Sequence, residues 1–345
     1  MKYAILYHPG HNRVYFDTSK RLAIPEFLIV TQDFTQKISD LQQEMIAGIE
    51  YLTFHIENPL TDNEIQTLSS LSYAYALYRL CYINDELLLL PVARTNPLFL
   101  DEGISGILKY SGKTNEIFTR MLINIAYASQ ANRTDIRLLD PIAGKGTTLF
   151  EGLIRGFDVY GVEIGEKVVA EAVTFTKKYL ENARYKFTCH SLKCSGPNKS
   201  YTAQRHSFSI AANKEDRKNK LSKTCEFIAG NTTHADKYYA KDFFDLIVGD
   251  LPYGVQHGNV TNEKQSSLTR NPAELLRVCL PIWKTVLKPG GVIALSWNRN
   301  VVARHIIEQI MTDAGFSVKQ EEAYIMDHRV DQSIWRDVIV ANKET

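Results

Sequence analysis

Two short turns in the sequence combine residue types that suit chemistry on a bound ligand. The first turn, DPIAGKGTT at residues 140–148, lies between a predicted strand and a predicted helix. Glycines there allow the backbone to approach a ligand closely, and the following helix directs its first N–H groups at that ligand. Because Asp140 precedes the glycines, the turn suits a ligand with an ammonium group and no phosphate. It is not a P-loop, because Gly146 rather than Ser or Thr follows Lys145.

The next predicted strand ends in a second acid. Glu163 follows Gly146 by seventeen residues, and Leu149 takes the place of the third glycine of a dinucleotide fingerprint. A carboxylate at the tip of this strand can accept hydrogen bonds from both ribose hydroxyls of a nucleoside. Asp140 and Glu163 therefore predict a nucleoside ligand that carries an ammonium group, as S-adenosylmethionine does.

The second turn, DLPYG at residues 250–254, directly follows the apolar segment FDLIVG. An exocyclic amine of a base is a poor nucleophile, because its lone pair is delocalised into the ring. A side-chain oxygen of Asp250 and the backbone carbonyl of Leu251 can accept its two N–H hydrogens and leave the lone pair facing a methyl donor. Pro252 fixes the turn, and Tyr253 offers a ring on which a flipped base can stack. This turn predicts methyl transfer to a base amine.

The motifs DPIAGKGTT, VEIG and DLPYG together resemble the amino-methyltransferase branch of the class I methyltransferases, and most closely the THUMP-associated guanosine-N2 RNA methyltransferases. The resemblance covers about residues 105–345. It implies an α/β, Rossmann-like fold with a seven-stranded, mostly parallel sheet, the cofactor S-adenosyl-L-methionine, and guanine N2 of tRNA or rRNA as the acceptor. It implies catalysis by Asp250, Leu251, Pro252 and Tyr253, and cofactor contacts by Asp140, Pro141, Ala143, Gly144, Gly146, Thr147, Glu163, Ile164, Asn231 and Thr232.

The sequence departs from the pattern of that family at three places. Asn231 stands where the family usually has an Asp that contacts the adenine, and its amide oxygen can make the same contact. Leu251 replaces the commoner Pro, at a position where the backbone carbonyl acts. The first hundred residues are too short for a complete THUMP domain with its usual ferredoxin-like partner. Two other classes of enzyme share the motifs, the DNA amino-methyltransferases and the protein methyltransferases that act on a glutamine amide.

The elements that must position these turns alternate between strand and helix from residue 101 to residue 345. The expected strands are 136–140, 157–164, 225–230, 244–250, 291–297, 316–326 and 336–343, and the expected helices are 116–129, 147–156, 166–183, 272–287 and 301–315. Such alternation predicts a parallel sheet with helices on both faces. No helix separates the last two strands, so at least one of them is expected to be antiparallel.

Residues 1–100 predict a smaller α+β domain, which is a candidate for RNA binding. The expected strands are 2–8, 12–18, 51–57 and 87–93, and the expected helices are 38–49 and 63–80. The second helix should open with a capping box formed by Thr61 and Glu64.

The most unevenly charged part of the sequence is a basic insertion at about 184–223. It contains ten Lys and Arg and two acids. Such a segment is either a solvated, disordered loop or a contact for a polyanion, which here would be the phosphates of RNA. Arg329 and Arg336 lie in a predicted turn region beside the active site, where they would either contact phosphate or be solvated.

The composition is that of a globular protein of 345 residues, with 44% hydrophobic and 23% charged residues and a formal net charge of +1. No apolar run approaches the roughly 20 residues of a membrane helix, and the N-terminus does not resemble a signal peptide. The five cysteines are scattered and odd in number, which argues against a disulfide framework. Cys189, His190 and Cys194 lack a second ligand pair for zinc. We therefore expect a cytoplasmic protein without a metal site.

Overall fold

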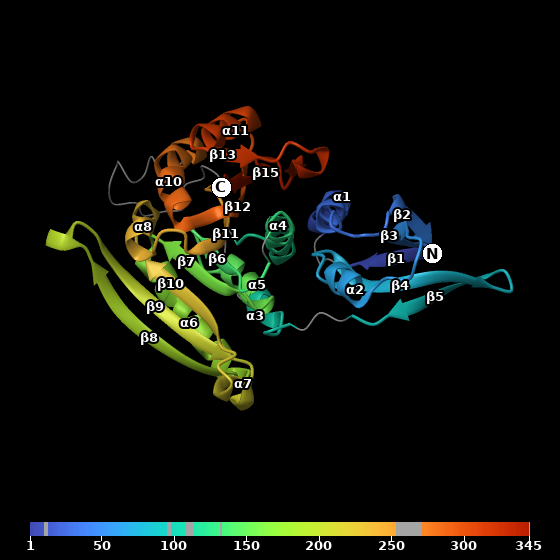
Figure 1. Cartoon of the computed structure of the whole chain (residues 1–345), viewed down its shortest axis with the longest axis horizontal. Coiled ribbons are helices and arrows are strands. Elements are labelled where there is room, and N and C mark those ends of the chain that lie inside the picture. Colours follow the sequence, from blue (N-terminus) through green and yellow to red (C-terminus); the bar gives the residue numbers. More distant parts are fainter. Residues whose placement is uncertain (10–12, 95–97, 108–112, 132, 253–270, 345) are drawn as a thin grey trace.

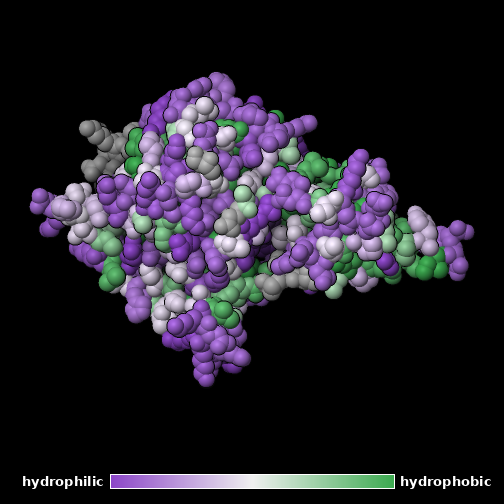
Figure 2. All heavy atoms as spheres, viewed as in Figure 1, coloured by the Kyte–Doolittle hydropathy of each residue, from purple (hydrophilic) through white to green (hydrophobic). Residues whose placement is uncertain are grey.

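The computed structural model describes residues 1–9, 13–94, 98–107, 113–131, 133–252 and 271–344 (Figure 1). Two β-sheets divide these residues between them, one before residue 100 and one after it. No helix in the described ranges is long and apolar enough to cross a membrane. The face shown in Figure 2 is mostly hydrophilic, with hydrophobic residues gathered over the first sheet at the right.

The first sheet belongs to a compact α+β unit. Its elements are β1 (Lys2–Tyr7), α1 (Arg13–Val30), β2 (Ser39–Ile46), β3 (Ile49–His55), α2 (Asp62–Ser69), β4 (Ala74–Ile83) and β5 (Glu86–Val92). The strands are antiparallel in the order β2-β3-β1-β4-β5. The first six elements follow the ferredoxin-like succession of strands and helices, and β5 extends the sheet at one edge.

Two predicted elements of this unit were wrong. The strand expected at 12–18 is the start of helix α1, and the helix expected at 38–49 is strand β2. Ala47 and Gly48 join β2 to β3 with φ angles of 49° and 81°, as a two-residue hairpin turn requires. The apolar pattern of 38–49 fits either period, and pairing with β3 decides between them.

The helix expected at 63–80 is divided between α2 and β4. The predicted capping box of Thr61 and Glu64 is confirmed, and α2 ends at Ser69. The Tyr-rich continuation lies in β4, where it pairs with β1 and β5. Aromatic side chains pack well on a pleated surface, and the available partner strands outweigh the weak helix propensity of this segment.

The second sheet contains ten strands in the described part of the chain. The strands are β6 (Arg137–Asp140), β7 (Asp158–Glu163), β8 (Lys186–Ser195), β9 (Thr202–Ala211), β10 (Lys223–Ala229), β11 (Phe244–Asp250), β12 (Leu287–Asn298), β13 (Phe316–Val318), β14 (His328–Arg329) and β15 (Trp335–Lys343). The helices are α3 (Gly103–Ile107), α4 (Glu116–Ala128), α5 (Thr147–Ile154), α6 (Glu166–Asn182), α7 (Lys214–Lys218), α8 (Ala235–Tyr238), α10 (Pro272–Val286) and α11 (Arg304–Asp313), with short 3-10 turns η1 (Pro197–Lys199), η2 (Thr232–His234) and η3 (Glu322–Tyr324).

The centre of this sheet is parallel and its edges are antiparallel. Strands β12-β11-β6-β7-β10 are parallel neighbours. The predicted antiparallel end is confirmed, since β15 runs antiparallel to both β12 and β13. The sheet exceeds the seven strands expected, because β9 and β8 extend it beyond β10 and β14 pairs with β15. The strand expected at 316–326 is shorter than predicted, because β13 ends at Val318 and η3 follows.

Alternate residues of the central strands enter two separate cores. Leu246 and Val248 of β11 lie in the core that contains α4, α5 and α6, whereas Ile247 lies in the core that contains α10 and α11. This alternation covers both faces of the sheet with helices, as the sequence predicts. The first of these cores continues into the N-terminal unit, where it includes Ile5 of β1 and Phe27 of α1.

The basic insertion is ordered, so its interpretation as a disordered loop was wrong. Strands β8 and β9 form a long hairpin at the edge of the sheet, and α7 lies at its base (Figure 1). Phe208 and Ile210 of β9 are buried in the core. The many charged residues of this segment concealed its apolar residues, which recur at every second position as in a strand.

Candidate functional site

The order of the parallel strands reverses between β6 and β11. The chain proceeds from β6 through β7 to β10 in one direction, then from β11 to β12 in the other. In open α/β sheets, ligands bind in the crevice outside the carboxyl ends of strands at such a switch point. Asp140 is the last residue of β6 and Asp250 is the last residue of β11. Two acids predicted from separate motifs thus meet at the place where this topology forms a crevice.

The glycine turn after β6 is shaped by two left-handed residues. Gly144 and Gly146 have φ angles of 52° and 92°, which glycine adopts without strain. A Cβ on Gly146 would lie 2.8 Å from a ring carbon of Phe227. The amide of Ala143 donates to the carbonyl of Val162 at 2.9 Å, which fixes the turn to β7.

Asp140 lies at the base of the crevice and is almost fully buried. Its Oδ1 accepts a hydrogen bond from the amide of Ile142 at 3.0 Å. Burial raises the pKa of Asp140 to about 7, and the nearby charges of Asp250 and Glu163 act in the same direction. A buried acid with such a pKa beneath a cleft is typical of a functional site.

Glu163, at the end of β7, is held against the glycine turn. One carboxylate oxygen accepts from the amide of Gly144 at 3.1 Å and the other from the amide of Gly165 at 2.8 Å. Burial raises the pKa of this carboxyl group. A carboxylate oxygen can accept two hydrogen bonds, so this geometry leaves each oxygen capacity for a ligand hydroxyl.

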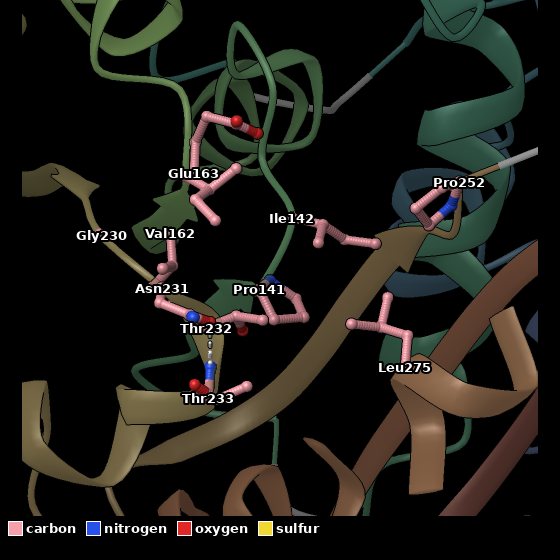
Figure 3. A pocket seen from close by; sticks show the side chains of 11 residues that line it. Pro141, Ile142, Val162, Glu163, Gly230, Asn231, Thr232, Thr233, Pro252 and Leu275 are labelled. Carbon is pink, nitrogen blue, oxygen red and sulfur yellow. Dashed lines mark hydrogen bonds between the residues drawn. The ribbon is translucent and has the colours of Figure 1, made fainter. Parts of the chain in front are cut away.

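A cleft of about 510 Å³, open to solvent, lies over the ends of these strands (Figure 3). Its walls are largely apolar, which suits a flat ring. The residues that line it are Pro141, Ile142, Val162, Glu163, Ile164, Gly230, Asn231, Thr232, Thr233, Pro252 and Leu275.

Asn231 and Thr232, after β10, have internal partners. The side-chain oxygen of Asn231 accepts from the amide of Thr233 at 3.0 Å and caps η2 (the dashed line in Figure 3). The hydroxyl of Thr232 accepts from Trp283 Nε1 at 2.9 Å. The amide oxygen predicted to face an adenine thus already serves the backbone, and the shape of the cleft at Asn231 depends on that cap.

The structure brings together only part of the predicted site. Pro141, Glu163, Ile164, Asn231, Thr232 and Pro252 line the cleft, whereas Asp140, Ala143, Gly144, Gly146 and Thr147 form the turn and helix start beneath it. Tyr253 lies outside the described residues. Sequence reasoning missed Ile142, Val162, Gly230, Thr233 and Leu275 as lining residues. Four of these are neighbours of predicted residues, and Leu275 alone had no local signal.

Asp250 is held from several distant parts of the sequence. Thr114 Oγ1 donates to its Oδ2 at 2.6 Å, and Ser296 Oγ donates to its Oδ1. Arg336 Nη2 lies 3.7 Å from Oδ2. The amide of Leu251 donates to the carbonyl of Ser296 at 2.8 Å, which fixes the start of the turn against β12. The carboxylate is therefore oriented before any ligand arrives.

Arg336 was expected either to contact phosphate or to be solvated, and both expectations were wrong. The residue is 5% exposed, and its guanidinium lies 4.3 Å from the ring centroid of Phe118. Cation–π contact and the ion pair with Asp250 compensate its burial. Arg329 is exposed, and its Nε donates to the carbonyl of Asp331 at 2.9 Å.

This arrangement can hold a cation beside Asp140, hydroxyls beside Glu163 and an amine beside Asp250. In the described part of the chain, no three His, Cys, Asp or Glu side chains are placed to hold a metal ion.

No family model matches the sequence, and no curated protein is similar to it. Solved structures with some similarity include the ribosomal protein L11 methylase of Lactobacillus delbrueckii subsp. bulgaricus, at 13% identity and a TM-score of 0.38 over 68% of this chain and 81% of that one. An rRNA methylase from Streptococcus thermophilus matches at 11% identity and a TM-score of 0.35, over 68% of this chain and 100% of that one. The 16S rRNA N2 methyltransferase of T. thermophilus (RsmC), in complex with AdoMet and guanosine, matches at 16% identity and a TM-score of 0.35, over 88% of this chain and 58% of that one. Similarity at this level assigns neither a family nor an activity to the chain.

Proposed function

We propose that the protein is an S-adenosylmethionine-dependent N-methyltransferase that methylates an exocyclic amine of a base, with guanine N2 of a tRNA or rRNA as the acceptor. The observation that carries this proposal is the pair of acids, Asp140 and Asp250, at the ends of adjacent parallel strands where the strand order reverses. One acid suits the ammonium group of the donor, and the other suits the amine of the acceptor.

The residues present fit the donor. The buried carboxyl of Asp140 directly precedes Pro141 and Ile142, which line the cleft, and Glu163 retains acceptor capacity for two ribose hydroxyls. Apolar side chains such as Ile142, Val162 and Leu275 provide flat walls for an adenine ring. When bound, S-adenosylmethionine supplies a methyl group on a positively charged sulfur.

The acceptor side rests on Asp250. Its carboxylate, oriented by Ser296 and Thr114, accepts one N–H of the base amine, and the backbone carbonyl of Leu251 accepts the other. Both bonds direct the nitrogen lone pair away from the ring and toward the cleft. Transfer of the methyl group would break its bond to sulfur, leave that electron pair on the neutral sulfur, and give the amine nitrogen a positive charge. The adjacent Asp250 carboxylate would stabilise this charge and accept the proton that the nitrogen loses.

The direct test is methyl transfer from isotopically labelled donor to RNA from cells that lack the gene. Nucleosides are then separated and identified by mass spectrometry. We expect labelled N2-methylguanosine that depends on the enzyme. Label on a ring carbon or a ribose oxygen would contradict the mechanism, and label only in DNA or in glutamine would assign the site to one of the two alternative substrate classes.

Glu163→Ala should weaken donor binding by about 1–3 kcal/mol, because a hydrogen-bonding charge is removed from a buried site. Glu163→Gln should lose less, since it keeps one acceptor oxygen. Calorimetry with the demethylated product measures both, and the exposed Glu181→Ala on α6 is the control. Wild-type protein that binds ATP or NAD and gives no heat with the donor would refute the assignment of the cleft.

Donor affinity should depend on pH through Asp140. Burial raises the pKa of this residue to about 7, and the donor ammonium binds its ionised form. The carboxyl is mostly ionised at pH 8 and mostly protonated at pH 6. The dissociation constant of the donor should therefore rise about tenfold when the pH is lowered from 8 to 6. Calorimetry at both pH values tests this expectation.

The control for this titration is Asp140→Asn, which should bind the donor weakly at pH 8 and with little change at pH 6. The free energy of unfolding of the donor-free protein should change in the opposite direction, so that it falls as the pH rises. Because the pKa of Asp140 is above its unfolded value of about 3.9, its contribution to stability is full below that value and is lost as pH rises through about 7. An affinity of the wild type that is flat from pH 6 to 8 would contradict the role of Asp140.

A further inference from the structure

A second pocket, of about 600 Å³, lies at the base of the β8–β9 hairpin. It is formed by three cationic and three hydroxyl side chains, which are Lys186, Thr188, Ser209, Arg217, Lys220 and Ser222. In Figure 1 the base of the hairpin, with α7, is at the bottom, and this region is hydrophilic in Figure 2. No carboxylate is among the residues that line this basic pocket.

The strand period creates the floor of the basic pocket. Phe187 packs against the core and Phe208 is buried in it, so the residues next to them in sequence face the other way. Thr188 of β8 pairs directly with Ser209 of β9, and Lys186 lies two residues before Thr188 on the same face. Packing of the apolar side chains against the core thus directs Lys186, Thr188 and Ser209 to the opposite face of the hairpin.

Helix α7 forms the wall of the basic pocket. Its N-cap, Asn213, accepts hydrogen bonds from the amides of Glu215 and Asp216 at 2.8 and 2.9 Å. The amide group of Asn213 also donates to the carboxylate of Asp216 at 2.8 Å. This cap holds one of the two acids of the insertion at the helix start, and Arg217 and Lys220 follow it into the pocket wall.

The three cations of the basic pocket are Lys186, Arg217 and Lys220. Among the residues that the structure describes, Lys186, Arg217 and Lys220 form no ion pair. Three cations that converge with hydroxyl donors on one hollow suit an anion with several oxygens, because each oxygen can accept a charge-assisted hydrogen bond.

We propose that the basic pocket binds a backbone phosphate of the RNA substrate at a point remote from the methylated base. Strand β10 begins beside the pocket at Lys223 and ends at Ala229, next to the donor cleft. Its seven residues make six steps of about 3.3 Å, which separates the two sites by about 20 Å. A folded RNA spans that distance, whereas a single nucleoside in the cleft does not. The identity of the anion as RNA rests on the proposed function, but the anion chemistry does not.

The test compares two triple variants with the same change of charge. The pocket variant is Lys186→Gln, Arg217→Gln and Lys220→Gln. The control variant is Lys178→Gln, Lys214→Gln and Lys218→Gln, which removes exposed cations of α6 and α7 that do not line the pocket. Fluorescence anisotropy with a labelled 24-base-pair RNA hairpin, at a series of KCl concentrations, measures the salt dependence of binding for both variants and the wild type.

We expect the pocket variant to flatten the slope of log affinity against log salt by about 1–2, as expected for the loss of one or two phosphate contacts. The control should change the slope by less than half as much, and affinity for guanosine, which carries no phosphate, should be equal in all three proteins. Equal flattening in both variants would overturn the pocket in favour of diffuse charge. An unchanged slope in the pocket variant would also overturn it.

The experiment distinguishes a failure of the pocket proposal from a failure of the proposed function. If the wild type binds RNA with a slope that depends on the pocket but transfers no methyl group to any RNA, the proposed function fails and the pocket stands. If it methylates RNA and the pocket variant keeps the wild-type slope, the pocket proposal fails alone. Thermal unfolding of each variant checks that these surface substitutions leave the fold intact.

Discussion

Asp250→Ala should lower the rate of methyl transfer by roughly 10²–10⁴-fold, the range expected when a positioned acid–base group is removed. The substitution removes the acceptor of one amine hydrogen and the negative charge beside the nitrogen. Donor binding should be largely kept, because the donor ammonium is assigned to Asp140 at the end of the neighbouring strand. Single-turnover rates and donor calorimetry on the same preparation measure the two effects.

Asp250→Asn is the matched control for the shape of the site. It retains an oxygen that can accept from Thr114 or Ser296 but lacks the charge that pairs with Arg336. Its rate should lie between those of the wild type and Asp250→Ala. A rate within threefold of wild type for Asp250→Ala, with RNA as substrate, would contradict the assignment of Asp250 to catalysis.

In the proposed mechanism, Thr114 and Ser296 position the carboxylate of Asp250. Each donates a hydrogen bond to a different oxygen of its carboxylate. Neither could be identified from the sequence, since Thr114 lies 136 residues before Asp250 and Ser296 lies 46 residues after it. Only the pairing of β11 with β12 places Asp250 opposite Ser296.

The predictable part of the site is the part built from local turns. Asp140 ends one strand, Gly144 and Gly146 follow it, and their spacing alone indicates a tight turn at a helix start. Glu163 follows the next strand, and a parallel sheet brings the ends of both strands to one edge. The apolar segments in this half of the chain were long, and their patterns were regular. The central parallel strands and the helices that cover them were therefore predicted.

The unpredictable part depends on pairing across the sheet or on burial of charge. Arg336 reads as a surface residue, because an arginine is almost never buried without partners. Its partners, Phe118 and Asp250, come from two other elements. In the same way, the segment 38–49 becomes a strand because β3 lies beside it. Tertiary contacts decide such cases, and a single sequence does not display them.

Glu26→Ala should lower the free energy of unfolding by about 3–5 kcal/mol, because three buried hydrogen-bond donors lose their acceptor at a cost of about 1–3 kcal/mol each. Glu26 lies on α1 and is fully buried. Its carboxyl accepts from the amide and hydroxyl of Ser72 at 2.9 and 2.5 Å and from Asn124 Nδ2 at 2.5 Å. Asn124 belongs to α4, so this group joins the N-terminal unit to the second sheet.

Denaturant unfolding measures the effect, and Glu50→Ala is the control. Glu50 pairs with Lys20 at 2.5 Å, but its side chain is 28% exposed, and such a surface pair contributes at most about 1 kcal/mol. Glu26→Gln should lose less than Glu26→Ala. Burial raises the pKa of Glu26, so its contribution is full below the unfolded pKa of about 4.3 and is lost as pH rises through the folded value. The deficit of Glu26→Gln should therefore narrow with rising pH.

The number of transitions in the unfolding curve shows whether the N-terminal unit and the second sheet unfold together. One apolar core runs from β1 through α1 and α4 to the second sheet, and we expect the wild type to unfold in a single transition. If Glu26 couples the two units, Glu26→Ala should separate this transition into two, with the N-terminal unit unfolding first. A single transition at nearly wild-type stability would contradict that role. Coupling of this kind would hold the N-terminal unit at a fixed position relative to the cleft, so that any RNA it contacts meets Asp250 in one orientation.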